Sequence, residues 1–281
     1  MIPEGYAPLT TMGEGAIAKV VKCLDTRSGD IVALKILKDI TDDDDVKRLG
    51  VEIESISRVR HPNIVTFITH GNTKDGAPYV VMEWLDGENL RDLLEKEESL
   101  DIMKIIEITL QILNALEACH RKSIVHRDLK PENVMLCGTN RDKVKLIDFG
   151  MAKLLLDGTD LTIDGQLFGT PQYLAPERIT GSCKATQQTD IYSLGIMIYE
   201  MAAGFRPFDG EDAQAILRQH LSERPKPLSS VALGELANPL LSQLVRRMMR
   251  QTPDQRPSAT SLLSEFRKLR QNLLNLKSGS V

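Results

Sequence analysis

The first 85 residues contain short runs in which apolar and polar side chains alternate, as they do in strands with one buried face. Two of these runs, 20–24 and 31–37, are separated by the turn sequence Ser28-Gly29-Asp30. A third run, 79–82, is apolar throughout and predicts a short buried strand. We therefore expect a small sheet in this part of the chain.

One helix interrupts the predicted strands. Residues 45–60 carry apolar positions at helical spacing, and the helix is expected to end before His61-Pro62 because proline disfavours helix in the residue before it. Residues 83–87 follow the third strand as a connector. We place a boundary near residue 85 and predict a strand-rich unit over residues 1–85.

From residue 86 onward the pattern is mainly helical. Residues 101–121 and 189–203 are apolar on several faces, which is typical of buried helices. The last predicted helix has a single apolar stripe, formed by Leu262, Phe266, Leu269 and Leu273. We predict a helical unit over 86–272 and a C-terminal tail over 273–281. The chain is thus expected to be an α+β protein with two lobes.

Composition and charge narrow the function. Of the 281 residues, 42% are hydrophobic, and the net charge of −4 gives no sign of a nucleic-acid-binding surface. No signal peptide or membrane-spanning segment is expected. The cysteines lack C-x-x-C spacing, which favours reduced thiols and a cytoplasmic location; they are Cys23, Cys119, Cys137 and Cys183.

Candidate chemistry is concentrated in the segment His126-Arg127-Asp128-Leu129-Lys130-Pro131-Glu132-Asn133. Fifteen residues after Asn133 comes Asp148, in Asp148-Phe149-Gly150. Phosphoryl transfer needs a group that accepts the proton of a hydroxyl, together with oxygen ligands for Mg²⁺. Asp128 can be the first group, and Asn133 and Asp148 can hold the metal, with Mn²⁺ as an alternative to Mg²⁺.

Further motifs occur in a fixed order around this segment: Gly13-Glu14-Gly15-Ala16-Ile17-Ala18-Lys19-Val20, Val32-Ala33-Leu34-Lys35 and Ala175-Pro176-Glu177. Together, from about Tyr6 to about Leu269, the motifs resemble the eukaryotic-like (Hanks-type) protein kinase family in its Ser/Thr branch, and their wording resembles bacterial-type members. The resemblance implies a two-lobed protein-kinase fold with ATP between the lobes. It also implies protein substrates with Ser or Thr hydroxyls, and autophosphorylation.

The resemblance implies a nucleotide site in the first lobe and the connector. Gly13 and Gly15 let backbone N–H groups approach phosphates, although Ala18 replaces the family's third glycine. Taken alone, the Gly-x-Gly motif favours a simple hairpin turn, and only the other motifs favour the phosphate loop. The expected phosphate-loop contacts are Gly13, Glu14, Gly15 and Ala16. The expected adenine-pocket residues are Val20, Ala33, Met82, Glu83, Leu85 and Met135.

Lys35 lies between apolar neighbours on a predicted strand, so it needs either solvent or a charged partner. The family lysine holds the ATP α- and β-phosphates and pairs with a helix glutamate. Glu52 and Glu54 are the candidates. Glu52 shares the apolar helix face with Leu49 and Ile56, whereas Glu54 lies about 200° away around the helix. We therefore expect a Lys35–Glu52 pair and a surface position for Glu54.

The same resemblance implies roles in catalysis and support. Asp128 is expected to accept the proton of the substrate hydroxyl, and Lys130 to place positive charge beside the transferring phosphoryl group. Thr170 is expected to bond toward both of these residues. His126 and Phe149 are interpreted as packing groups, with His126 as a general base the alternative.

Two structural roles and two regulatory roles are also implied. Glu177 should form a buried ion pair with Arg256, and Asp190 should anchor the backbone of the catalytic loop. Arg127 can bind a phosphate on the activation segment, 148–177. Our hypothesis is that Thr162 carries this phosphate after autophosphorylation, which self-association would permit in trans; a plain loop threonine is the alternative.

Glu132 raises a separate hypothesis about substrate choice, that it favours a basic residue upstream of the target hydroxyl. Two other functions stay open. One is a pseudokinase or scaffold, although the expected chemical residues are all present. The other is a small-molecule phosphotransferase, which would not need the peptide platform expected between Thr170 and Glu177.

Overall fold

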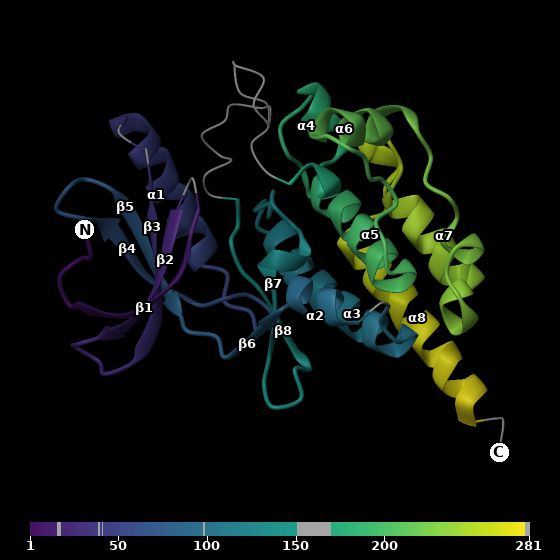
Figure 1. Ribbon diagram of the computed structural model, residues 1–281, viewed down its shortest axis with the longest axis horizontal. Coiled ribbons are helices and arrows are strands. Elements are labelled where there is room, and N and C mark those ends of the chain that lie inside the picture. The colour runs from purple at the N-terminus through teal and green to yellow at the C-terminus, as the bar shows by residue number, and fades with distance from the viewer. Residues whose placement is uncertain (16–17, 39, 41, 98, 151–169, 279–281) are drawn as a thin grey trace.

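The computed structural model describes residues 1–15, 18–38, 40, 42–97, 99–150 and 170–278. The chain forms two lobes side by side, a strand-rich N-lobe and a helical C-lobe (Figure 1). This arrangement confirms the predicted α+β architecture and the change of pattern near residue 85.

The N-lobe is a five-stranded antiparallel sheet in the order β1-β2-β3-β5-β4. On the central strand β3, Val32, Leu34 and Ile36 are buried, as their alternation predicts. Cross-strand pairing places Ala33 directly opposite Met82 on β5. The strands are β1 (Tyr6–Glu14), β2 (Ala18–Asp25), β3 (Ile31–Leu37), β4 (Phe67–Asn72) and β5 (Pro78–Glu83).

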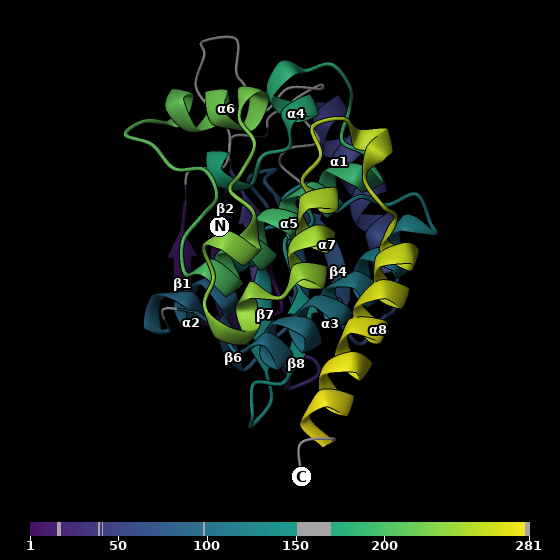
Figure 2. The ribbon, with the colours of Figure 1, turned by 90° about the vertical axis from the view of Figure 1, so that its right-hand side faces the viewer.

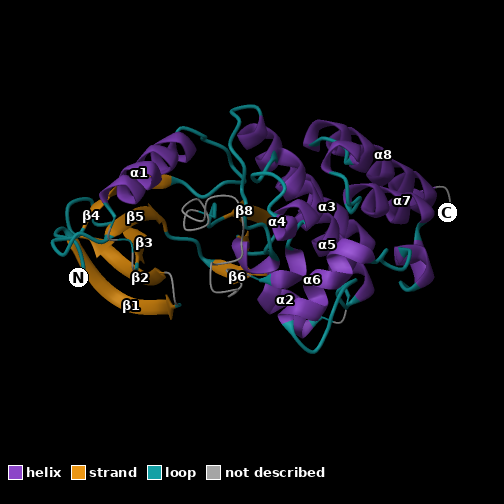
Figure 3. Cartoon of the chain, turned by 90° about the horizontal axis from the view of Figure 1, so that it is seen from above, coloured by secondary structure: helices purple, strands orange, loops and turns teal. Residues whose placement is uncertain are grey.

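One helix, α1 (Asp43–Ser57), packs beside this sheet (Figure 3). Its N-terminus is capped by Asp42, whose carboxylate accepts hydrogen bonds from two backbone N–H groups of the first turn. Leu49 and Ile53 on α1 belong to one hydrophobic cluster with Met82. The apolar face of α1 therefore fixes the direction in which its polar residues point.

A second, three-stranded sheet lies between the lobes, in the order β6-β7-β8 (Figure 3). Its strands are β6 (Gly87–Asn89), β7 (Val134–Cys137) and β8 (Lys143–Leu146). Gly87 opens β6, and a Cβ atom there would lie 2.2 Å from the carbonyl oxygen of Leu136. Only glycine allows this close approach of the connector to β7.

The C-lobe is built around α5, whose side chains from Thr189 to Ala202 are all buried. Figures 1 and 2 show α5 surrounded by the other helices of this lobe. The helices are α2 (Leu90–Lys96), α3 (Ile102–His120), α4 (Pro176–Thr180), α5 (Gln187–Ala203), α6 (Ala213–Ser222), α7 (Pro239–Met248) and α8 (Ala259–Ser278). The predictions that α3 and α5 are buried helices are confirmed.

The predicted boundary of the C-terminal tail at residue 273 is wrong. Helix α8 continues to Ser278 and packs along α3 (Figure 2). The reason is that Leu273 completes the apolar stripe of α8 and is 6% exposed in the main core. Among the helices that the structure describes, none combines the length and apolar character needed to cross a membrane.

Candidate active site

A cavity of about 330 Å³ lies between the lobes, beneath the strands β1, β2, β3 and β5. The structure brings the expected adenine-pocket residues together in its lining, namely Val20, Ala33, Met82, Glu83, Leu85 and Met135, with Asp148 also present. The Glu83 carboxylate accepts from Lys145 Nζ at 2.7 Å, and the Glu83 N–H donates to the carbonyl of Thr66 at 3.0 Å, so both groups are engaged within the protein. Their contacts with a nucleotide stay a prediction.

Sequence reasoning missed other lining residues, among them Met12, Val65, Trp84 and Ile147. Three of them had a usable signal, the first being Trp84, which lies between the expected residues Glu83 and Leu85. Met12 directly precedes Gly13, and Ile147 directly precedes Asp148, so apolar residues beside the two motifs were candidates for the cavity wall. Val65 had no such signal, because its place depends on how the segment after α1 packs.

The expected phosphate loop is a hairpin between β1 and β2. Gly13 lies opposite Val20, and Gly15 N–H donates to the carbonyl of Ala18 at 3.0 Å. A Cβ on Gly13 would meet no atom within 4 Å, and one on Gly15 only the Ala18 oxygen, at 3.9 Å. Packing within the protein therefore does not require glycine at these positions, which favours a role in the close approach of a ligand.

Glu14, the last residue of β1, pairs with Lys38 at 2.8 Å and with Lys19 at 3.5 Å. The hydrogen bond from Lys38 is the main reason why the pKa of the Glu14 carboxyl lies below its usual value. Ala16, the fourth expected member of the loop, lies outside the described residues.

A buried carboxylate on α5 anchors the catalytic loop, residues 126–133. Asp190 is 1% exposed and accepts from the backbone N–H groups of His126 and Arg127, at 2.9 and 3.0 Å. Its Oδ2 also lies 2.9 Å from His120 Nε2. Arg127 has a positive φ of 68°, which these hydrogen bonds help to hold. The prediction that Asp190 anchors this loop is confirmed.

The loop brings three of the predicted catalytic and metal residues into one hydrogen-bonded group. Asn133 Nδ2 donates to Asp128, to its carbonyl at 2.7 Å and to Oδ2 at 3.0 Å. Lys130 Nζ lies 3.3 Å from the same Oδ2 and donates to Thr170 Oγ1 at 3.2 Å. We call Asp128, Lys130 and Asn133 the catalytic row; the Thr170 hydroxyl of the expected peptide platform contacts this row through Lys130.

Asp148 and Asn133 suit a magnesium ion that is shared with phosphate oxygens. The amide nitrogen of Asn133 faces Asp128, which leaves its amide oxygen as the atom that a cation would use. Within the described residues there is no group of three or more His, Cys, Asp or Glu residues that could hold a metal without a ligand's help. Mg²⁺ is commonly bound by one or two side chains together with substrate phosphates.

The predicted Lys35–Glu52 pair is absent, and this expectation is corrected. Lys35 Nζ lies 2.6 Å from Asp148 Oδ1, whereas Glu52 Oε1 accepts from Arg127 Nη1 at 2.9 Å. Glu52 therefore pairs with Arg127 in place of Lys35, and Lys35 pairs with Asp148 in place of Glu52. The helix face of Glu52 was predicted correctly, but the position of α1 brings that face to the catalytic loop. Glu54 lies at the surface as expected and pairs with Arg58.

His126 and Phe149 pack together, as expected. Their ring centroids are 4.6 Å apart, and Phe149 also contacts Phe67 of β4 with centroids 6.3 Å apart. His126 is fully buried, its burial lowers its pKa, and its Nε2–H donates to the carbonyl of Ile147 at 2.9 Å. A neutral, enclosed imidazole is unsuited to exchange protons with a substrate, so the packing interpretation is favoured over the general base.

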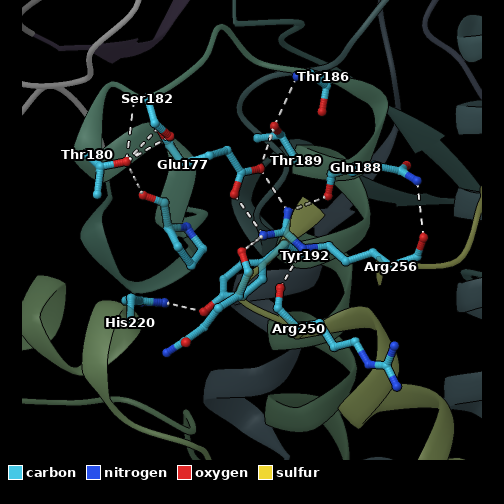
Figure 4. Close-up of polar contacts among 12 residues, drawn as sticks. Glu177, Thr180, Ser182, Thr186, Gln188, Thr189, Tyr192, His220, Arg250 and Arg256 are labelled. Atoms are coloured by element: carbon cyan, nitrogen blue, oxygen red, sulfur yellow. Dashed lines mark hydrogen bonds and ion pairs between the residues drawn. The ribbon is translucent and has the colours of Figure 1, made fainter. Parts of the chain in front are cut away.

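Below the platform, Glu177 and Arg256 form the predicted buried ion pair (Figure 4). Arg256 Nη1 and Nη2 donate to the two carboxylate oxygens at 2.8 and 2.7 Å. Thr189 Oγ1 donates to Glu177 as well, at 3.0 Å. The pair fixes the end of the segment that contains Thr170, while Thr162 of the same segment lies outside the described residues.

His220 on α6 is expected to make the stability of the fold depend on pH. It is fully buried, with Nδ1 2.8 Å from the hydroxyl of Tyr192 (Figure 4), and burial lowers its pKa to about 4. In the unfolded chain the His220 side chain binds a proton below about pH 6.5, whereas in the folded protein it stays neutral down to about pH 4. Its contribution to stability is therefore complete above about pH 6.5 and declines as the pH falls toward 4. We expect His220 to account for about 3 kcal/mol of the free energy of unfolding lost over this range.

Urea unfolding between pH 7.5 and pH 4 tests this expectation. His220→Asn should be less stable at pH 7.5 but lose less stability on acidification, with buried His126 responsible for part of the remaining slope. The matched control is His70→Asn, because His70 is exposed on β4. A wild-type slope in His220→Asn would contradict the assignment.

Comparison with known proteins agrees with this geometry. The family model described as "Protein kinase domain" matches residues 6–266. "Serine/threonine-protein kinase pkn3" of Myxococcus xanthus is 33% identical over 261 residues, covering 90% of this chain and 48% of the relative. "Serine/threonine-protein kinase PknB" of Mycobacterium leprae is 32% identical over 273 residues, covering 95% of this chain and 42% of the relative.

Among solved structures, Rad53 1–466 in complex with AMP-PNP superimposes with a TM-score of 0.75 at 26% identity, covering 93% of this chain and 65% of that chain. The chain spans less than half the length of the two bacterial relatives. The match over residues 6–266 contains all the motifs that form the cavity and the catalytic row. The chain belongs to the protein kinase family, in its bacterial-type Ser/Thr branch.

Proposed function

We propose that this chain transfers the γ-phosphoryl group of ATP to Ser and Thr hydroxyls of proteins, itself included, with Mg²⁺ as the metal and Mn²⁺ as an alternative. The observation that carries the proposal is the row formed by Asp128, Lys130 and Asn133 beside the Lys35–Asp148 pair. This row offers a proton acceptor, a cation and metal ligands at one edge of the interlobe cavity.

The reaction follows from these groups. Asp128 accepts a hydrogen bond from the substrate hydroxyl and takes its proton as the hydroxyl oxygen bonds to the γ-phosphorus. The bond from that phosphorus to the β,γ-bridging oxygen breaks, and ADP leaves. Lys130 balances charge on the phosphoryl oxygens, and Lys35 does so on the α- and β-phosphates. A magnesium ion held by Asn133 and Asp148 would neutralise the phosphates further.

The pairing of Glu52 bears on regulation. In the catalytic arrangement, as the family resemblance implies, Glu52 exchanges Arg127 for Lys35. A phosphate on the activation segment would compete for Arg127, since a guanidinium binds phosphate strongly. Phosphorylation of Thr162, in trans within a transient pair of chains, would therefore release Glu52. This regulation is part of the proposal. We also propose that the protein is cytoplasmic and that it does not act on nucleic acid.

Transfer of labelled phosphate from ATP with Mg²⁺, to the protein and to a generic Ser/Thr substrate, tests the proposed function. Lys35→Met should lower the rate by about 10²-fold or more, because a cation at the developing charge is lost. Mass spectrometry should locate phosphate on Thr162, and Thr162→Ala should lower activity.

Two outcomes would count against the proposal. Nucleotide binding without transfer to any hydroxyl would favour a scaffold, and transfer only to small molecules would favour the phosphotransferase alternative. Unchanged activity and phosphate content in Thr162→Ala would remove the regulatory part alone.

A further inference from the structure

Arg91 on α2 links three separate parts of the C-lobe. It donates from Nη1 to Glu200 Oε1 at 2.9 Å and from Nε to Glu132 Oε1 at 3.3 Å. Its Nη2 donates to Glu200 Oε2 at 3.3 Å and to the hydroxyl of Tyr173, which in turn donates to Glu200. We name Arg91, Glu132, Tyr173 and Glu200 the Arg91 cluster.

The Arg91 cluster flanks the row in which the substrate hydroxyl is expected. Glu132 comes two residues after Lys130, and Tyr173 comes three residues after Thr170. Because Lys130 bonds to Thr170 at 3.2 Å, the two segments that supply Glu132 and Tyr173 are already joined beside the catalytic row. A substrate peptide on this platform would therefore pass close to the cluster.

The cluster is partly open to solvent. The Glu132 side chain is 39% exposed, and Arg206, whose Nε lies 3.7 Å from Glu200 Oε1, is 31% exposed. Glu200 itself is 7% exposed, so its charge requires a cation beside it. Arg91 supplies the nearer cation, at 2.9 Å against 3.7 Å for Arg206, and also contacts Glu132.

We propose that Arg91 is a specificity-determining residue, which occupies a guanidinium site beside the phosphoacceptor and so prevents the kinase from selecting arginine in its substrates. The proposal rests on the proposed protein kinase function. It replaces the sequence-based hypothesis that Glu132 favours a basic residue, because Glu132 already bonds to Arg91.

Removal of Arg91 should reverse this selection. In Arg91→Ala, the two oxygens of Glu200 and the hydroxyl of Tyr173 would face the space left by the guanidinium. Glu132 Oε2, which is buried without a hydrogen-bond partner among the described residues, would add another acceptor. A substrate arginine has the shape and charge to fill this space, since a guanidinium binds two carboxylates in the same plane.

The experiment compares peptides in which arginine, or its neutral isostere citrulline, is placed at each position around one serine. For the wild-type protein we expect arginine and citrulline peptides to differ by less than about threefold in kcat/KM at every position. Arg91→Ala should favour arginine by about tenfold or more at one position. The double variant Arg91→Ala/Glu200→Gln should lose that preference, which separates the site from a general effect of net charge.

A folded Arg91→Ala protein without any arginine preference would overturn the proposal. If Arg91→Ala does not fold, wild type and Glu132→Gln decide instead. If neither protein distinguishes arginine from citrulline peptides in kcat/KM, the proposal is supported. If the wild-type protein prefers arginine and Glu132→Gln abolishes that preference, the proposal is refuted. Absence of transfer to every peptide would count against the kinase function itself and is a different result.

Discussion

Asp128→Asn should reduce phosphoryl transfer by about 10³-fold or more while nucleotide affinity stays near that of wild type. The expected loss matches the 10²–10⁴-fold contribution of a positioned acid or base, with the loss of a charge beside Lys130 added. Asparagine can still accept a hydrogen bond from the hydroxyl, but it cannot take the proton. Nucleotide binding should persist because the side chains that line the interlobe cavity do not include Asp128.

The local structure makes this variant informative. Asp128 Oδ2 is 3.3 Å from Lys130 Nζ and 3.0 Å from Asn133 Nδ2, so its position is set by two donors. Asparagine is nearly the same size and keeps an oxygen that both donors can reach. A large loss of rate would therefore reflect the missing proton acceptor and charge, and a thermal unfolding curve should confirm that the fold is retained.

Labelled-ATP transfer and nucleotide titration measure the two quantities. Asp142→Asn is the matched control, because Asp142 is an exposed carboxylate in the loop between β7 and β8. Activity of Asp128→Asn above roughly one tenth of wild type would remove Asp128 from the proposed role, since a general base contributes about 10²-fold at least.

The sequence allowed the catalytic row to be predicted because its members are close together along the chain. Asp128, Lys130 and Asn133 lie within six residues, and one turn of backbone brings them into contact. The lining of the cavity was predicted in part from the family resemblance, and alternation along β2 and β3 explains why the expected residues of these strands share a face. Such local patterns depend little on how the lobes are placed.

The partners of the charged residues could not be predicted in the same way. Glu52 lies on the expected helix face, yet which cation it meets depends on the distance between α1 and a loop 75 residues away. Arg91 gave no signal at all, because its neighbours Leu90 and Asp92 indicate only the start of a helix. Its partners Glu132 and Glu200 are 41 and 109 residues away in sequence.

The Glu52–Arg127 pair and the packed Phe149 describe two different parts of one site. Phe149 already contacts both His126 and β4, so the rings that join the lobes are assembled. Only the charged contacts differ from the expected arrangement. The side chains of the Glu52–Arg127 and Lys35–Asp148 pairs are 14–31% exposed, so they can exchange partners without any repacking of the buried rings. A shift of Glu52 toward Lys35 is therefore compatible with the rest of the fold.

Replacement of Glu177 by glutamine should lower the free energy of unfolding by about 3 kcal/mol, and Arg256→Met by about 5 kcal/mol. Glutamine leaves Arg256 as a buried cation without its counter-charge. Methionine leaves Glu177 unpaired and removes more, because Arg256 also donates to three backbone carbonyls, those of Arg250, Gln188 and Gln251 at 2.7, 2.9 and 2.9 Å. The loss of these three hydrogen bonds carries a further cost.

The double variant Glu177→Gln/Arg256→Met should be about as unstable as Arg256→Met alone. The two side chains share one interaction, so their effects are not additive, and the three hydrogen bonds from Arg256 to backbone carbonyls are lost in both variants. Recovery to wild-type stability would mean that the ion pair acts alone. This outcome would contradict the role of Arg256 as the donor that joins the segments around α5.

An exposed pair of the same length provides the control. Arg58 and Glu54 are also 2.7 Å apart, but their side chains are 70% and 58% exposed, whereas those of Arg256 and Glu177 are 0% and 3% exposed. Glu54→Gln should therefore cost no more than about 0.5 kcal/mol, as exposed helix pairs do. Urea unfolding of Glu54→Gln and Glu177→Gln measures the difference in the free energy of unfolding. The chemical change is the same in both variants, but it is made at the surface in the first and in the core in the second.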